Sequence, residues 1–310
     1  MRFLVFGAGA IGSVFAGLLA RGGRDVTLLA RGERLRRLGR DGLRLIDVGG
    51  EVLEPPVEVV GDVPTEAEFD YVLVCVRADQ VGDALPAAAR AKSPTIVPMV
   101  NHASGYDAWA EAAGAGRLMV GFPGAGGAVE DDGVHYGIPS KLIEETTLGE
   151  LNGSSSERLR VLAGCLEDAG FNVATTKRID AWQRYHAAYI SALLLGIGRH
   201  EGDVDAFLAD AATKREAALA IKEGFAMLGR LGFPVTPSNL LPMKLLPARA
   251  LAGALGLFGR NETFREMFAT GASRLSVQEA PTLGAQIIAM AEAEGIEMPN
   301  YRRLLPADSR

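Results

Sequence analysis

The chain is poor in the residues that build metal centres and disulfide frameworks. It has two cysteines and four histidines among 310 residues. Cys75 and Cys165 both lie in apolar stretches, and we interpret them as small buried hydrophobes. The histidines show no metal-ligand spacing, since they are scattered at His102, His135, His186 and His200. The sequence therefore predicts neither a disulfide framework nor a bound metal ion.

A basic excess and a long uncharged apolar run are also missing. The formal net charge is −6 at pH 7, which indicates that nucleic acid is not a partner, although arginines cluster at 31–40. The apolar stretch 240–258 carries Lys244, Arg249 and two prolines, whereas a membrane span needs about 18 uninterrupted apolar residues. We interpret it as a loop followed by a core or interface helix, and expect no membrane partner. The amino end shows no cationic leader with a cleavage site, so we expect a cytoplasmic location.

The first half of the sequence alternates between strand and helix patterns. Such alternation is typical of parallel strands joined by right-handed helical crossovers. The segments 43–47 and 54–60 are expected to form a hairpin, and short strands within 126–150 to extend the sheet antiparallel. Strand patterns end near residue 177, and helical patterns follow. We predict an α/β fold, with a doubly wound parallel sheet over 1–177 and an all-α domain over 178–310.

The stretch "VFGAGAIGS" holds three glycines in G-x-G-x-x-G spacing between an apolar strand and an apolar helix. In that context the pattern is the dinucleotide-binding fingerprint of a Rossmann-type domain. One glycine permits the tight turn, one lets the backbone approach a pyrophosphate, and one lets helix and strand pack closely. The expected cofactor-binding residues of this turn are Gly7, Ala8, Gly9, Ala10, Ile11 and Gly12.

The end of the next strand indicates which dinucleotide is bound. NAD-binding proteins usually place an acidic residue there for the ribose 2′-hydroxyl, whereas this strand ends at Arg31. An arginine suits a 2′-phosphate through its charge and planar donors, which favours NADP(H). Glu33 is the rival acidic residue, and Arg31 with its neighbours could instead form a solvated helix face.

With these features placed, the chain resembles the ketopantoate reductase (2-dehydropantoate 2-reductase) family as a divergent member. The resemblance rests on the glycine motif, Arg31, "VCVRADQV", Asn101, "RIDAWQR" and "SVQEAPTL…EGIEMPNYRRL". It implies a Rossmann domain and a helical domain with the active site in the cleft. It also implies an oxidoreductase of pantothenate biosynthesis, acting on CH–OH groups, in which NADPH reduces a small-molecule 2-oxo acid. The implied assembly is a monomer or homodimer.

The resemblance assigns further roles to single positions. Arg77 stands where the family has a lysine near the cofactor, and Asn101 is expected to contact cofactor or substrate. Asn101, Arg184 and Glu279 are the implied catalytic residues. Two plainer interpretations stay open: Asn101 could cap a turn, and Glu279 could be an acid favoured by the dipole of a helix first turn.

Arg184 departs from the family in a way that matters chemically, because it replaces the lysine implied as general acid. An arginine effectively cannot release a proton, since its pKa is above about 12. It can still stabilise developing negative charge on a carbonyl oxygen. The proton would then come from water, His102, Tyr185 or His186. The competing interpretation is that Arg184 forms an interdomain ion pair.

Three more departures concern the substrate. Ala188, Pro281 and Gly284 stand where the family tends to have polar residues. Two alternatives to 2-dehydropantoate reduction therefore remain. One is a reductase of a bulkier or less polar carbonyl compound, and the other is a non-catalytic NADP(H)-binding regulator.

Overall fold

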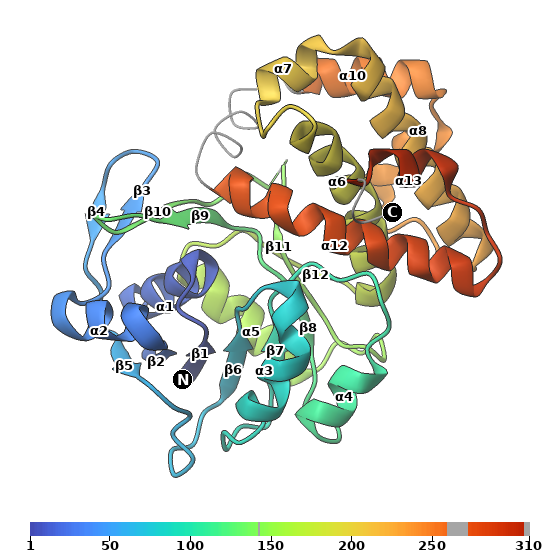
Figure 1. The fold of residues 1–310 in the computed structure, drawn as a ribbon. Coiled ribbons are helices and arrows are strands. Elements are labelled where there is room, and N and C mark those ends of the chain that lie inside the picture. The colour runs from blue at the N-terminus through green and yellow to red at the C-terminus, as the bar shows by residue number, and fades with distance from the viewer. Residues whose placement is uncertain (142, 259–271, 307–310) are drawn as a thin grey trace. The chain divides into compact units, whose positions relative to one another are not determined.

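The computed structural model describes residues 1–141, 143–258 and 272–306. The chain folds into two compact units, which are drawn in Figure 1. The first unit contains Met1–Val100 and Tyr106–Ile179. The second contains Asn101–Gly105 and the chain from Asp180 onward.

A five-stranded parallel sheet is the centre of the first unit, and its strand order is β5-β2-β1-β6-β7. The chain leaves β1 toward one edge and later returns to the other side of β1, so the order reverses there. This confirms the predicted doubly wound parallel sheet. The strands are β1 (Arg2–Phe6), β2 (Asp25–Leu29), β5 (Glu58–Val60), β6 (Tyr71–Val74) and β7 (Ile96–Pro98).

A three-stranded sheet continues beyond β7. Parallel bridges join Ile96 to Leu118 and Met99 to Gly121, so β8 (Val120–Phe122) follows β7 side by side. Its neighbour β11 (Thr146–Gly149) runs antiparallel to β8, as predicted for this region, and β12 (Val173–Thr175) runs parallel to β11.

The predicted hairpin between 43–47 and 54–60 is wrong. β3 (Leu45–Asp47) turns back onto β4 (Val52–Leu53), and Asp47 Oδ1 accepts from the Glu51 amide at 2.8 Å in that turn. Pro55 and Pro56 then end the strand, because proline cannot donate to a ladder. β5 pairs with β2 instead. β3 and β4 form a small sheet with β9 (Gly126–Val129) and β10 (Val134–Gly137), so β9 and β10 do not extend the central sheet as predicted.

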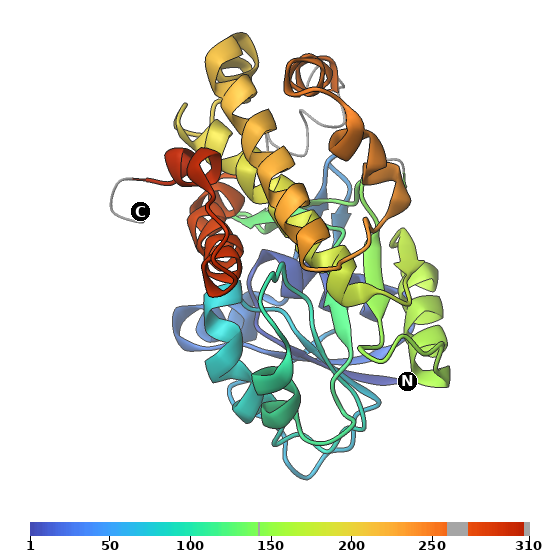
Figure 2. The same cartoon turned by 90° about the vertical axis from the view of Figure 1, so that its right-hand side faces the viewer.

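Helices cover both faces of the central sheet (Figures 1 and 2). α1 and α5 share one apolar core with Phe3 and Val5 of β1, and the Phe15 and Phe171 rings stack at 4.3 Å within it. α3 and α4 pack against each other on the opposite face. The helices are α1 (Ala10–Arg21), α2 (Gly32–Asp41), α3 (Val81–Ala88), α4 (Asp107–Ala113) and α5 (Glu157–Asp168), with a 3-10 turn at Ala78–Gln80.

The described part of the second unit is helical, which confirms the predicted all-α domain. Tyr185 and Phe225 meet edge to face at 4.9 Å where α6 crosses α8. Among the described residues no helix is both long and apolar enough to span a bilayer. The helices are α6 (Ile179–Gly198), α7 (Val204–Ala209), α8 (Ala211–Arg230), α9 (Leu241–Leu245), α10 (Ala248–Phe258), α12 (Ala272–Ala293) and α13 (Pro299–Leu304), with a 3-10 turn at Ser238–Leu240.

The division between the units lies close to, but not at, the position expected from sequence. The strand pattern suggested a boundary after residue 177, whereas Ile179 still belongs to the first unit. Its side chain is buried against Gly149, where an added Cβ would lie 2.6 Å from the Ile179 Cβ. Asn101–Gly105 packs with the second unit, although the residue before it, Val100, belongs to the first unit.

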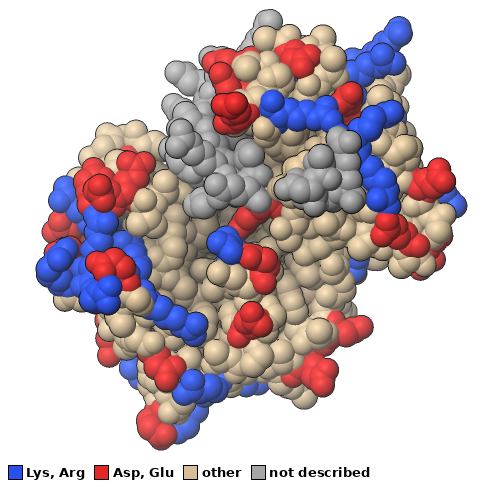
Figure 3. Space-filling model, viewed as in Figure 1, with Lys and Arg blue, Asp and Glu red and all other residues tan. Residues whose placement is uncertain are grey.

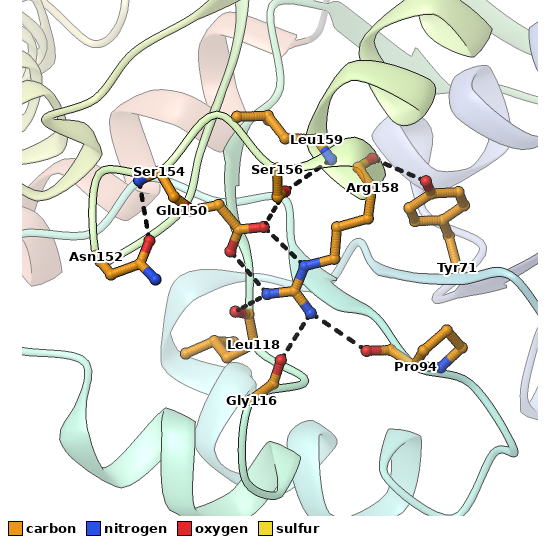
Figure 4. Close-up of polar contacts among 10 residues, drawn as sticks. All are labelled: Tyr71, Pro94, Gly116, Leu118, Glu150, Asn152, Ser154, Ser156, Arg158 and Leu159. Atoms are coloured by element: carbon orange, nitrogen blue, oxygen red, sulfur yellow. Dashed lines mark hydrogen bonds and ion pairs between the residues drawn. The ribbon is translucent and has the colours of Figure 1, made fainter.

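A buried ion pair joins α5 to the strand ends of the first unit (Figure 4). Arg158 donates to both carboxylate oxygens of Glu150 at 2.7 Å, and to the carbonyls of Gly116 and Leu118. Ser156 also donates to Glu150 at 2.5 Å. Burial alone would raise the pKa of Glu150, but the hydrogen bonds from Arg158 and Ser156 hold it below its ordinary range.

Replacing Glu150 with Gln should therefore change how stability responds to acid. A carboxyl group with a depressed folded-state pKa stabilises the fold above its unfolded pKa, and that stabilisation is lost as the pH falls toward the folded value. We expect wild-type protein to lose more stability than Glu150→Gln between about pH 7 and about pH 3.5, measured by urea unfolding. Equal losses in the two proteins would contradict this role for Glu150.

Candidate functional site

The glycine turn between β1 and α1 is built as its spacing predicts. Gly7 has φ +112°, and a Cβ there would lie 2.5 Å from the Cys75 carbonyl oxygen. A Cβ at Gly12 would lie 1.8 Å from the Gly7 carbonyl oxygen, so the helix can pack on the turn only without a side chain. Gly9 differs from both, because a Cβ there would meet no atom within 4 Å. The space above Gly9 is open on the side where a ligand would approach.

The amino end of α1 has no side-chain cap. Gly9 is its N-cap residue, and the first turn contains no acidic side chain. Some described helices are capped by a side chain: Ser156 accepts from the Leu159 amide in α5, and Asp210 accepts from the Ala212 amide in α8. Others, such as α2, α3 and α4, start without a side-chain cap as α1 does. The first amides of a helix need an acceptor, and together with the helix dipole they favour an anion. The α1 end therefore has the character of a phosphate site.

Basic side chains gather over α2, at the left of Figure 3. Arg31 is the exposed N-cap residue of α2, and its guanidinium carbon lies 5.6 Å from the Phe6 ring centroid. Arg36 binds the Glu33 carboxylate, with Nε at 3.0 Å, and lowers the pKa of Glu33. The rival acidic residue is thus paired with a cation of its own helix.

Arg34 has a contact that the sequence did not predict. Its Nε donates to the Ala8 carbonyl at 3.1 Å, and its Nη2 donates to Ser13 Oγ at 3.2 Å. Arg34 therefore joins α2 to both ends of the glycine turn. The available signal was helical spacing, since Arg34 lies one turn after Arg31 in a helix that follows β2.

Arg77 follows β6 as Arg31 follows β2. Its side chain is exposed and pairs with Asp79, with Nε–Oδ1 at 3.0 Å and Nη2–Oδ2 at 2.8 Å. Because β1, β2 and β6 are parallel neighbours, the glycine turn, Arg31 and Arg77 all lie at their carboxyl edge. Ligands of doubly wound sheets bind at this edge, next to the point where the strand order reverses.

In the second unit, Arg184 lies in a largely buried polar cluster and is itself 9% exposed. Its Nε donates to Asp180 Oδ1 at 2.7 Å, an i,i+4 pair within α6. Its Nη1 donates to the Ala103 carbonyl at 2.6 Å, and its guanidinium carbon lies 4.7 Å from the Phe233 ring centroid. Arg184 thus forms an ion pair inside the second unit through Nε, while Nη2 lies outside these contacts.

The segment Asn101–Gly105 is held by side chains from two helices. Gln183 Oε1 of α6 accepts from the His102 amide at 3.2 Å, and Gln286 Oε1 of α12 accepts from the Ala103 amide at 3.0 Å. Asn101 Oδ1 is buried and has no hydrogen-bond partner among the described residues. Because Arg184 donates to the Ala103 carbonyl, the structure brings Arg184 and the Asn101–Gly105 segment together.

Glu279 is partly buried on α12, seven residues before Gln286. Seven residues are close to two helical turns, so Glu279 and Gln286 share one face of α12. Glu279 lies inside the helix rather than in its first turn.

The three side chains considered as proton donors are buried and neutral in character. Burial lowers the pKa of His186 to about 3, so its ring is not an imidazolium near neutral pH. Burial also lowers the pKa of His102, with a further contribution from the Arg184 cation. Tyr185 donates to the Phe233 carbonyl at 3.0 Å, and burial raises its pKa.

Two of the positions that depart from the family are packed. A Cβ at Gly284 would lie 3.1 Å from Leu305 Cδ2 and 3.2 Å from Leu195 Cδ1. Ala188 is fully buried, and its carbonyl accepts from the Tyr301 hydroxyl at 2.8 Å. These surroundings are apolar core, so a polar side chain at position 284 would need a rearrangement.

The structure also gathers three possible metal ligands that sequence spacing did not indicate. One ligand atom each of Glu130, Asp132 and His135 lies within 4.8 Å of the others, on the β9–β10 hairpin. The two carboxylates are exposed, and His135 Nε2 lies 2.8 Å from Asp132 Oδ1. His135 and Asp132 thus already bond each other, and the exposed carboxylates are accessible to solvent.

Comparison with known proteins agrees with this geometry. Residues 3–153 match the family model described as ketopantoate reductase PanE/ApbA. The 2-dehydropantoate 2-reductase of Halobacterium salinarum is 27% identical over 98% of this chain and 96% of its own length.

Solved structures resemble the fold over nearly the whole chain. The 2-dehydropantoate 2-reductase of Geobacter metallireducens has a TM-score of 0.72 at 20% identity, covering 98% of this chain and 97% of that protein. D-mandelate dehydrogenase, solved with NADH and anilino(oxo)acetate, has a TM-score of 0.78 at 14% identity, covering 98% of this chain and 96% of that protein. The amino-terminal part of the chain, residues 3–153, thus matches the ketopantoate reductase family model, and the similarity to a curated 2-dehydropantoate 2-reductase extends over nearly the whole chain.

Proposed function

We propose that the protein reduces a 2-oxo acid, 2-dehydropantoate or a close relative, with NADPH as hydride donor. The observation that carries the proposal is the uncapped amino end of α1, next to a cluster of arginines on α2. The family match and the name of the Halobacterium salinarum relative support the reaction class. A cytoplasmic location and a homodimer stay predictions.

The residues present suit a phosphorylated dinucleotide. The open backbone at Gly9 and the free first amides of α1 would bind the pyrophosphate. Arg31 would bind the 2′-phosphate, with Arg34 fixed beside it, and Glu33 is already neutralised by Arg36. Arg77 would add a cation at the same sheet edge. NADPH, when bound, supplies the hydride that is transferred to C2 of the 2-oxo acid.

The second unit would supply the electrostatic part of the reaction. Reduction places negative charge on the carbonyl oxygen, and the Arg184 guanidinium can stabilise that charge without giving up a proton. Asn101 would orient substrate or cofactor through its side-chain amide. Glu279, on α12, would be a further catalytic residue. Since the nearby histidines and Tyr185 are buried, water would deliver the proton.

A second candidate is the reduction of a 2-oxo acid with a larger, less polar side chain. Its support is the apolar packing at Ala188 and Gly284, where groups for a small polar acid are missing. The anilino(oxo)acetate in the D-mandelate dehydrogenase structure carries a bulky aryl group beside an oxo-carboxylate, as an amide analogue of such an acid. A panel of 2-oxo acids, followed by NADPH absorbance, separates the two candidates. NADPH binding without any turnover would favour the regulator instead.

Substitution by alanine should have different effects at two glycines of the turn. Gly9→Ala should fold as wild type, because its Cβ meets no atom, but should weaken NADPH binding at least about tenfold by blocking the pyrophosphate. Gly12→Ala should also lose about 1–3 kcal/mol of stability through overpacking. Fluorescence titration and thermal unfolding measure the two effects. Unchanged NADPH affinity in Gly9→Ala would contradict the placement of the pyrophosphate.

Loss of Arg31 or Arg34 should change cofactor preference. We expect Arg31→Gln to weaken NADPH binding about 10–100-fold while changing NADH binding little, because charge-assisted bonds to the 2′-phosphate are lost. Arg34→Gln should also weaken NADPH binding more than NADH binding, but with some loss for NADH, because Arg34 bonds the glycine turn. Arg40→Gln is the matched control, since Arg40 lies on the same helix and pairs with Asp41. Equal weakening toward NADPH and NADH would remove these arginines from the phosphate site.

Substitutions at Arg184 should separate charge from proton transfer. Arg184→Met should lower kcat about 10²–10³-fold, as for loss of one transition-state donor. Arg184→Lys should keep part of the activity and gain an alkaline limb in its pH–rate profile, because lysine titrates and arginine does not. Arg178→Met is the control, since Arg178 is exposed in the turn just before α6. Equal kcat in the Met and Lys variants would exclude Arg184 from catalysis.

A further inference from the structure

The Asn101–Gly105 segment carries irregular backbone into the packed interior of the second unit. Ala103 is fully buried and belongs to the apolar core of the second unit, and His102 is 5% exposed. A buried peptide group without a partner is destabilising, so its hydrogen bonds must come from somewhere. Here they come from side chains rather than from a helix or a sheet.

Three side chains supply these bonds, and they account for three consecutive peptide groups. Gln183 accepts from the His102 amide at 3.2 Å, and Gln286 accepts from the Ala103 amide at 3.0 Å. Arg184 donates to the Ala103 carbonyl at 2.6 Å. Gln183 and Arg184 are neighbours on α6, whereas Gln286 lies on α12, so the segment is held from two helices.

We propose that Gln183 and Gln286 are positioning residues that fix Asn101 for the reaction, with Arg184 as the third member of the same clamp. This inference rests on the proposed function for its catalytic consequence, but the clamp itself does not. Asn101 lies next to the clamped peptides, and its Oδ1 is buried with no hydrogen-bond partner among the described residues. The clamped backbone of His102 and Ala103 therefore fixes the neighbouring Asn101, whose Oδ1 is left available to accept a hydrogen bond from a ligand.

The clamp also explains why residue 184 can be arginine. Arg184 donates from two separate nitrogens, from Nε to the Asp180 carboxylate and from Nη1 to the Ala103 carbonyl. Such a pair of bonds needs the planar guanidinium group with its several donors. A lysine has a single nitrogen and could not keep both geometries. The bond to the Ala103 carbonyl therefore fixes the Arg184 side chain as well as the Asn101–Gly105 segment.

Gln286 is the best member to test, because its side chain is only partly buried, whereas Gln183 is fully buried. Gln286→Leu removes the acceptor at similar volume, and Gln286→Glu keeps an acceptor for the Ala103 amide. Met290→Leu is the matched control, since Met290 lies one turn on in α12 and contacts Arg184 through Sδ at 3.3 Å without bonding the segment. All variants are made in the full chain.

Hydrogen exchange tests the clamp without any turnover. We expect exchange at the Ala103 amide to accelerate about tenfold in Gln286→Leu, and to stay near wild type in Gln286→Glu and Met290→Leu. Unchanged exchange in Gln286→Leu would overturn the clamp.

Kinetics with NADPH and a 2-oxo acid test the positioning role. We expect kcat of Gln286→Leu to fall at least about tenfold, with rescue in Gln286→Glu and NADPH affinity within about twofold of wild type. Faster exchange with unchanged kcat would overturn positioning and leave a structural clamp. A wild-type protein that turns over no 2-oxo acid would overturn the proposed function and the positioning role together, while the exchange result still decides the clamp.

Discussion

The uncapped amino end of α1 is the constraint on which the interpretation of the first unit depends. Gly9 offers no side-chain acceptor, whereas Ser156, Asp203 and Asp210 cap three other helices of the chain. Helix-end amides that the protein does not satisfy favour an external anion. Around this end the chain places Arg31 and Arg34, with Arg34 bonded to the turn itself. Open amides and fixed cations together suit a dinucleotide that carries an extra phosphate.

The second unit is organised around polar bonds within an apolar helical core. Hydrogen bonds among buried polar groups restrict the chain to one arrangement. Arg184, Gln183 and Gln286 satisfy the peptides of His102 and Ala103. The same bonds give Arg184 a defined orientation, which a free cation on a long side chain would lack. Structural and catalytic interpretations of Arg184 are therefore compatible, since orientation is what an electrostatic catalyst requires.

Local patterns predicted the elements whose structure is decided locally. The glycine spacing predicted the turn, and the alternation of strands and helices predicted the doubly wound sheet. The ion pair of Arg184 with Asp180 was readable as an i,i+4 spacing, although the sequence suggested a partner in the other domain. The pairing of β5 with β2 was missed because Pro55 and Pro56 break the apparent hairpin.

Long-range contacts were beyond the sequence. Ala103 and Gln286 are 183 positions apart. No periodicity in the sequence indicates that the Gln286 side chain on α12 accepts a hydrogen bond from the Ala103 backbone amide in the loop after β7. For the same reason Asn101–Gly105 was assigned to the first domain, whereas it packs with the second unit. The Arg34 bonds to Ala8 and Ser13 depend on how α2 packs beside α1. These features depend on how elements distant in the sequence pack together, and a single sequence does not reveal that packing.

The most direct test of the central claim is an equilibrium titration of the purified full chain with NADPH and with NADH at matched ionic strength, followed by cofactor fluorescence. The account predicts saturable binding of both dinucleotides, with NADPH bound at least about tenfold more tightly because only it presents a 2′-phosphate to the arginines. Tighter binding of NADH, or no saturable binding of either dinucleotide at millimolar concentration, would contradict it.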